Sequence, residues 1–96
     1  MRFEWHPPKA VSNLEKHGVS FEEAATVFND RDQIYDRDDA HSYGELRFFC
    51  IGLSVQRRLL TVVCTERPDE TMRIISAREA TRREEEEYAA QNYLTG

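Results

Sequence analysis

The sequence predicts an α+β fold in which an antiparallel sheet carries two N-terminal helices and one C-terminal helix, in the order β-α-α-β-β-β-β-α. Ser-x-x-Glu capping boxes at residues 20–23 and 76–79 mark two helix starts, because the Ser hydroxyl and the Glu carboxylate of such a box bind free backbone N–H groups. From residue 46 onward, short runs rich in aromatic and β-branched residues are typical of strands. A chain of 96 residues has room for a single domain, residues 1–96, with one core.

The first two elements are expected to be a short strand and a helix. Residues 1–5 alternate between polar and apolar side chains, as a short strand does. Pro7 and Pro8 then provide the fixed φ of a helix start. The helix should cover residues 9–17 and end at Gly18, which suits a C-terminal cap.

The remaining elements are a helix, a loop, a meander and a last helix. The helix should cover residues 21–29, and the acidic residues 31–44 should form a loop with a short strand at 33–35. Three apolar runs predict the antiparallel meander, at residues 46–53, 59–65 and 72–77. Both faces of the first two runs are apolar, so these strands should be central and covered on both sides. The N-terminal helices cover one side only. The second capping box predicts that the last helix begins where the last strand ends and continues to about residue 93.

Composition and cysteine placement indicate a folded, cytoplasmic protein. The chain is 40% hydrophobic and 32% charged, and it contains no apolar run of the length that a signal peptide or a membrane-spanning helix needs. Cys50 and Cys64 each lie in a strand-like run. A turn at residues 54–57 would pair residue 50 with residue 61 or 62, which leaves Cys64 too far away for a disulfide. Two buried, reduced thiols are therefore expected.

The net charge of −5 argues against indiscriminate nucleic-acid binding, but the charge is unevenly distributed. Residues 1–56 contribute −4, residues 57–83 contribute +3 and residues 84–96 contribute −4. All seven basic residues of the middle segment are arginines, whose planar guanidinium groups suit bidentate contacts with phosphate. The middle segment is therefore where an anion would bind.

Three of these arginines are candidates for an anion site at the start of the predicted last helix. Arg78 and Arg82 would be one turn apart on one helix face, and Arg73 would lie just before the same helix start. Basic residues at a helix start, followed by glutamates, reverse the order that the helix dipole favours. The alternative is a solvated face on which Glu79 pairs with Arg83 and the later glutamates neutralise the other arginines. The sequence leaves both interpretations open.

Two further candidates could take part in proton transfer. Glu66 and Arg67 end a predicted strand, where an acid beside a base can act as proton acceptor and phosphate clamp in RNA cleavage. The following Pro68 and Asp69 favour a simple turn instead. His17 is a candidate general acid or base, although its place before Gly18 is also explained by a favourable interaction with a helix C-terminus.

Other classes of site lack their signatures. His6, His17 and His41 show no metal-ligand spacing, and the acidic loop residues at 36, 38 and 39 do not follow the pattern of a calcium-binding loop. The glycines are isolated, so no phosphate-binding loop is present, and no local signature of a serine or cysteine nucleophile occurs. We expect no metal and no cofactor. Metal-free phosphodiester chemistry, or binding alone, remains.

Several segments of the chain resemble the BrnT family over almost the whole length. They are the opening FEW at residues 3–5, the KHG at 16–18, the SFEEA at 20–24 and the RIISAR at 73–78. The resemblance implies a toxin of a type II toxin–antitoxin pair with a RelE-like fold and ribonuclease activity. It also implies a BrnA antitoxin with a ribbon-helix-helix segment, bound in a hetero-oligomer, so that operator DNA is contacted only through the antitoxin.

The resemblance further implies that the RNA-cleaving surface lies along the sheet and the start of the last helix. The residues that fall there, or that we add as candidates, are Glu66, Arg67, Arg73, Arg78 and His17 for catalysis, and Arg78, Arg82, Arg83, Lys9 and Lys16 for RNA binding. We infer that the arginines hold the scissile phosphate. Glu66 or His17 would assist proton transfer from the ribose 2′-hydroxyl.

The chain also departs from the family pattern. His6 replaces a common aspartate, Glu79 a common basic residue, and residues 84–87 a tail that is usually more basic. Two hypotheses result: an endoribonuclease toxin that acts without metal, or a catalytically silent module that binds an antitoxin and acts in transcriptional co-repression. Convergence of Glu66, Arg73 and Arg78 in one pocket would favour the first.

Overall fold

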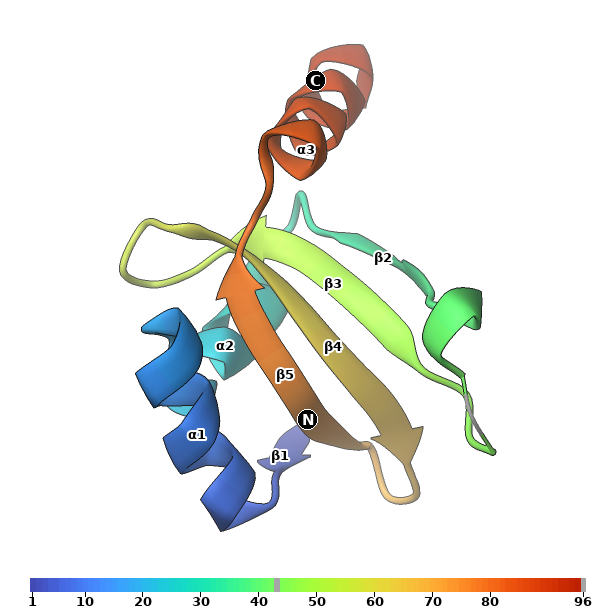
Figure 1. The fold of residues 1–96 in the computed structure, drawn as a ribbon. Coiled ribbons are helices and arrows are strands. Elements are labelled where there is room, and N and C mark those ends of the chain that lie inside the picture. Colours follow the sequence, from blue (N-terminus) through green and yellow to red (C-terminus); the bar gives the residue numbers. More distant parts are fainter. Residues whose placement is uncertain (43, 96) are drawn as a thin grey trace.

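The computed structural model describes residues 1–42 and 44–95, and its elements follow the predicted order β-α-α-β-β-β-β-α with short 3₁₀ turns added. They are β1 (Arg2–Glu4), α1 (Pro7–His17), α2 (Phe21–Thr26), η1 (Val27–Asn29), β2 (Ile34–Arg37), η2 (Asp39–His41), β3 (Phe48–Leu53), β4 (Leu59–Arg67), β5 (Thr71–Glu79) and α3 (Arg82–Thr95). In this part of the chain the five strands form one sheet; α2 packs on one of its faces, and α1 lies beside the β5 edge (Figure 1). No helix among these residues has the length and apolar composition of a membrane span.

The strands lie in the order β1-β5-β4-β3-β2. β2 to β5 form an antiparallel meander in which Cys50 pairs with Val62, as predicted. β1, however, pairs with β5 in parallel, so the prediction of a wholly antiparallel sheet is wrong at this edge. A hairpin forces two strands to be antiparallel, but β1 and β5 are separated by most of the chain and can pair in either direction.

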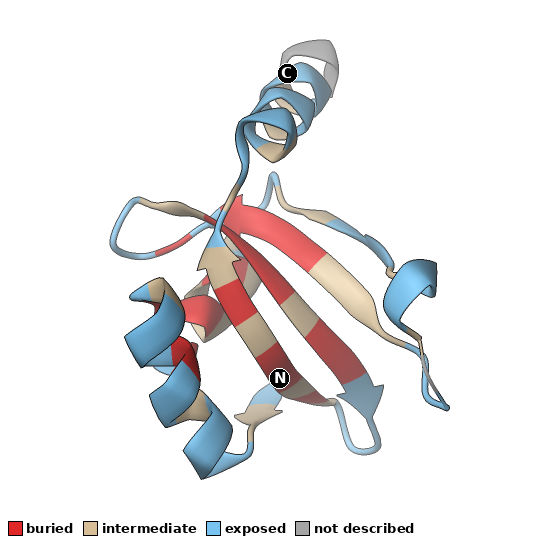
Figure 2. Cartoon of the chain, viewed as in Figure 1, coloured by how far each residue is buried: buried red, intermediate tan, exposed pale blue. Residues whose placement is uncertain are grey.

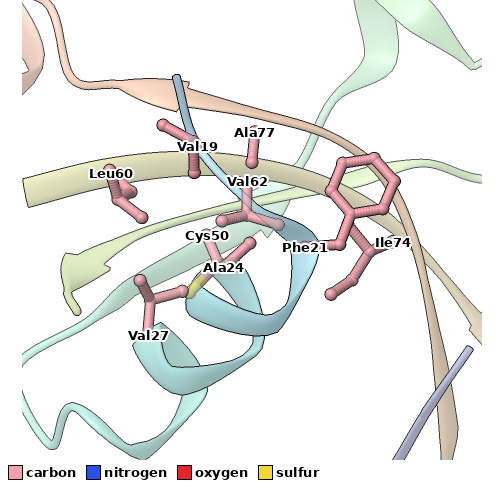
Figure 3. Packing of buried hydrophobic residues seen from close by; sticks show 9 residues of the cluster. All are labelled: Val19, Phe21, Ala24, Val27, Cys50, Leu60, Val62, Ile74 and Ala77. Carbon is pink, nitrogen blue, oxygen red and sulfur yellow. The ribbon is translucent and has the colours of Figure 1, made fainter. Parts of the chain in front are cut away.

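The core lies between α2 and the sheet (Figure 3). Its buried cluster consists of Val19, Phe21, Ala24, Val27, Cys50, Leu60, Val62, Ile74 and Ala77. Buried residues concentrate on the central strands and on the inner sides of α1 and α2, whereas β2 and α3 are mostly exposed (Figure 2). Both cysteines are buried and free, as expected, and burial raises the pKa of each thiol to about 12.

Polar contacts fix α1 and α2 on the sheet. The side-chain amide of Asn13, which is buried, donates to the carbonyl oxygens of Val19 and Ala77 at 3.0 and 2.8 Å. Its own carbonyl accepts from the Ala77 N–H at 3.1 Å, so α1 is tied to β5. The predicted cap of α2 forms, because the Glu23 N–H donates to Ser20 Oγ at 3.0 Å. These contacts leave the sheet face opposite α2 without an N-terminal helix across it.

The second predicted capping box, residues 76–79, is wrong. These residues belong to β5, where Ser76 pairs with Val63 and the pairing with β4 continues to Glu79. Strand pairing binds their backbone groups, so they cannot also begin a helix. Arg78 is therefore a strand residue, and it does not share a helix face with Arg82.

The helix instead begins at Arg82 with a different capping box. The Thr81 N–H donates to Glu84 Oε1 at 2.8 Å, and the Glu84 N–H donates to Thr81 Oγ1 at 3.2 Å. Glu84 and Glu85 lie in the first turn, where the helix dipole favours negative charge. With the start placed here, Arg82 and Arg83 still begin the helix, but Glu84 and Glu85 share its first turn and offset part of their unfavourable interaction with the dipole.

Candidate functional site

The face of the sheet opposite α2 carries a groove with a volume of about 580 Å³. Its floor consists of side chains that alternate with those of the core, namely Phe49, Ile51, Thr61, Val63, Ile75 and Ser76. All six come from β3, β4 and β5, and four of them are apolar. The second covering layer that the two-sided strands predicted is thus incomplete, and α3 stands only over one end of the sheet (Figure 1).

Charged side chains line the groove. The cationic or cation-forming ones are Lys9, His41, Arg47, Arg78 and Arg83. The carboxylates are Asp38, Glu84 and Glu87. These residues come from α1, from β5, from α3 and from the segment that precedes β3. On a chain with a net charge of −5, the groove is a place where positive groups gather.

Arg78 is held over the sheet by Glu84. Its Nη1 and Nη2 atoms donate to Glu84 Oε1 and Oε2 at 2.7 and 3.0 Å, which is a bidentate ion pair. Glu84 Oε1 also accepts from the Thr61 hydroxyl at 2.9 Å. Burial raises the pKa of Glu84, but the hydrogen bonds from Arg78, Thr81 and Thr61 outweigh it and lower the pKa to about 2. Glu84 is therefore ionised at neutral pH, and it fixes the guanidinium group before any ligand arrives.

His41 faces the groove with an aspartate behind it. Its Nδ1 atom lies 3.0 and 3.1 Å from the two carboxylate oxygens of Asp38. The His41 side chain is 64% exposed, whereas that of Asp38 is only 16% exposed. The imidazole is thus accessible to a ligand while its partner is largely shielded.

Arg47 lies immediately before β3, on the same side of the groove. Its side chain is 28% exposed, and its Nε atom, which is buried, has no hydrogen-bond partner among the described residues. The nearest carboxylate oxygen, on Glu45, is 3.8 Å from that Nε. Arg47 thus places a guanidinium group in the groove wall, with its Nε turned inward.

Comparison with known proteins assigns the family. Residues 5–84 match the family model described as "Ribonuclease toxin, BrnT, of type II toxin-antitoxin system". The chain belongs to the BrnT family. The crystal structure of the Brucella abortus ribonuclease toxin BrnT is similar, with a TM-score of 0.67 and 23% identity over 85% of this chain and 99% of that one. At this identity the likeness shows a shared fold. No curated protein matches the chain.

In this BrnT-family chain the predicted site residues separate into two regions. Lys9, Arg78 and Arg83 line the groove. Glu66 and Arg67 lie at the far end of β4 and line two smaller clefts there. Along β4, Glu66 lies an even number of residues from Val62 of the core, so its side chain points to the same face of the sheet as Val62. There its carboxylate accepts a hydrogen bond from the Tyr35 hydroxyl at 2.7 Å. Glu66, Arg73 and Arg78 do not share a pocket.

The other predicted residues lie outside the groove lining. Arg73 donates to Glu4 Oε2 at 2.8 Å, across the β1–β5 pairing. Arg82 is 92% exposed, with its Nε atom 3.6 Å from Glu86 Oε1. Lys16 and His17 occupy the last turn of α1, before the left-handed Gly18. Arg83 pairs with Glu87 at 3.5 Å rather than with Glu79.

Sequence reasoning missed three residues of the groove: Asp38, His41 and Arg47. The sequence predicts a loop at residues 31–44 with a short strand at 33–35, and it brings His41 into question only as a metal ligand. The Asp-x-x-His spacing was an available signal, because side chains three residues apart meet in a helical turn. Arg47 directly precedes an apolar strand, but nothing in the sequence shows toward which face it turns.

Proposed function

We propose that the chain is an endoribonuclease toxin that cleaves RNA in the groove without a metal ion. The observation that carries this proposal is the meeting of Arg47, Arg78 and Arg83 over an open sheet face on an acidic protein. Guanidinium groups bind phosphate oxygens in bidentate fashion. Phe49 on the groove floor offers an aromatic surface on which a base can pack.

The chemistry follows from the ribose 2′-hydroxyl. Its oxygen attacks the neighbouring phosphorus, and the bond to the 5′-oxygen breaks, which leaves a 2′,3′-cyclic phosphate and a 5′-hydroxyl. Negative charge grows on the phosphate during the attack, and pre-positioned cations stabilise it. Phosphate would replace the Glu84 carboxylate on Arg78, since both are bidentate acceptors. Glu66, Arg67, Arg73 and His17 remain candidates outside the groove.

Cleavage is expected to persist in EDTA. Among the described residues, no group of three or more histidine, cysteine, aspartate or glutamate side chains is arranged to hold a metal ion. The measurement is the rate at which the purified chain cleaves a single-stranded RNA with EDTA and with added Mg²⁺, beside a magnesium-dependent nuclease as control. Activity that is lost on chelation and restored by Mg²⁺ would refute metal independence.

The antitoxin is proposed to be BrnA-like and to carry the contact with operator DNA. The family is one of type II toxin–antitoxin systems, so an antitoxin partner belongs to its function. Phe49 and Val63, which are half-buried, give the groove an apolar floor that a protein partner can cover. We expect the tagged chain to co-purify with the product of the adjacent gene and to arrest growth only when that gene is absent. A lone monomer recovered after co-expression would contradict the pairing.

The silent antitoxin-binding module remains the second candidate, for one reason. The five arginines that the sequence analysis favoured each have a carboxylate neighbour: Arg67 and Arg73 with Glu4, Arg78 with Glu84, Arg82 with Glu86 and Arg83 with Glu87. These pairs reduce the field available to RNA. A chain that binds its antitoxin but neither cleaves RNA nor arrests growth would establish this second function.

A further inference from the structure

Of the three histidines, all of them in the described part of the chain, His41 is the one that lines the groove. His6 occupies the position before α1, and His17 lies in the last turn of that helix. An imidazole is the side chain best suited to exchange protons near neutral pH. The groove therefore contains a proton-transfer group as well as phosphate-binding groups.

The Asp38 carboxylate determines how the ring can act. An ionised carboxylate only accepts hydrogen bonds, so the Nδ1 atom beside it carries the hydrogen. In the neutral ring Nε2 is then left with a free lone pair. A carboxylate that holds Nδ1–H in this way sets both the tautomer and the orientation of a catalytic histidine.

The turn that carries the pair is fixed to the sheet through its backbone. The Asp38 N–H donates to the Arg47 carbonyl at 2.7 Å. The Ser42 hydroxyl donates to the Asp38 carbonyl at 2.9 Å and accepts from the Arg47 N–H at 3.0 Å. His41 and Arg47 are thereby held at one wall of the groove by contacts that do not involve the imidazole.

We propose that His41 is the general base of RNA cleavage and that Asp38 is its positioning residue; this inference rests on the function proposed above. His41 Nε2 takes the proton of the ribose 2′-hydroxyl as the 2′-oxygen forms its bond to phosphorus. The bond from phosphorus to the 5′-oxygen breaks, and the 5′-oxygen takes a proton from water. His41 then releases its proton to solvent. Arg47 and Arg78 receive the phosphate oxygens.

The charged groups that line the groove with His41 include both signs. The cations are Lys9 of α1, Arg47, Arg78 of β5 and Arg83 of α3, and the carboxylates are Asp38, Glu84 and Glu87. A ring that already carries a proton cannot accept one. The cleavage rate is therefore expected to fall in acidic solution.

The test compares His41→Gln with His6→Gln in cleavage of a short RNA by the purified chain. We expect His41→Gln to lower kcat about a hundredfold or more and to remove the fall at acidic pH, while His6→Gln behaves as wild type. Added imidazole should restore part of the activity of His41→Ala. Asp38→Asn should lower kcat about tenfold with KM unchanged and should move the pH at which the rate falls. The thermal midpoint of each variant shows whether it is folded. If His41→Gln does not fold, the kcat and pH profile of Asp38→Asn test the proposed role of His41.

Other results would overturn the assignment. If the wild type cleaves RNA and His41→Gln keeps both its rate and its pH profile, His41 is not the base, although the proposed function stands. A loss confined to His17→Gln would move the role to His17. If the wild-type chain does not cleave RNA under any of these conditions, the proposed function fails and the role of His41 fails with it.

Discussion

Replacing Arg78 with alanine is expected to slow RNA cleavage about ten- to a hundredfold, because charge-assisted hydrogen bonds to phosphate contribute on the order of 1.5–3 kcal/mol. The guanidinium group is already in position over the sheet, held by both oxygens of Glu84. Lysine at this position should restore little activity, since a point charge cannot reproduce the two parallel hydrogen bonds. The measurement is the cleavage rate of each variant beside its thermal midpoint.

Glu84→Gln is the matched control, because it removes the same ion pair from the other side. Glutamine can still serve in the capping box with Thr81. Both Arg78→Ala and Glu84→Gln should therefore lower stability by a similar amount, on the order of 1 kcal/mol. Glu84→Gln, however, leaves Arg78 free for phosphate and should bind RNA at least as tightly as wild type, most clearly at low salt. If the two variants lose stability together and neither changes cleavage, Arg78 is only a structural partner of Glu84.

The fold could be predicted where local signals decide it. Ser20 caps α2, Gly18 ends α1 in the left-handed conformation, and the change to strand-like runs gives the meander. The start of α3 could not be predicted in this way. Two Ser/Thr-x-x-Glu patterns, from residue 76 and from residue 81, lie five residues apart. Pairing of β5 with β4 selects the second one, and that pairing is a contact between distant parts of the chain.

The candidate site was predicted only in part, for the same physical reason. Both faces of β3 and β4 are apolar, so the alternation of side chains could not show which face α2 would cover. That choice turns Glu66 toward Tyr35 and Arg78 toward the groove. His41 and Arg47 lie at the groove because hydrogen bonds from Asp38 and to Ser42 hold the turn with His41 against the backbone of Arg47. Contacts between residues far apart in the chain determine these positions, and the local sequence does not reveal them.

The largest loss of stability is expected from Arg58→Ala, which breaks a buried ion pair. The Glu23 side chain is only 2% exposed, and its carboxylate accepts from Arg58 Nε at 3.0 Å and from the Ser54 hydroxyl at 2.7 Å. Arg58 also donates to the Gly18 carbonyl at 3.0 Å, so one side chain joins the β3–β4 turn to both N-terminal helices. Removing one partner of such a pair costs about 3–5 kcal/mol, because the other charge stays buried without compensation. For a domain of this size, the thermal midpoint should fall by more than about 10 °C.

The pH dependence of unfolding separates the ion pair from simple packing. The hydrogen bond from Arg58 lowers the pKa of Glu23, and burial opposes this effect without cancelling it. A carboxyl group whose pKa is lower in the folded state stabilises the fold above its unfolded pKa, and this stabilisation is lost as the pH falls through the folded pKa. Denaturant unfolding should therefore show a shallower loss of stability on acidification in Glu23→Gln than in wild type.

Arg57→Ala, an exposed change in the same turn as Arg58, is the control, and its stability should stay within about 0.5 kcal/mol of wild type. A loss below about 1 kcal/mol in Arg58→Ala would mean that solvent reaches Glu23 and that the pair does not hold the helices.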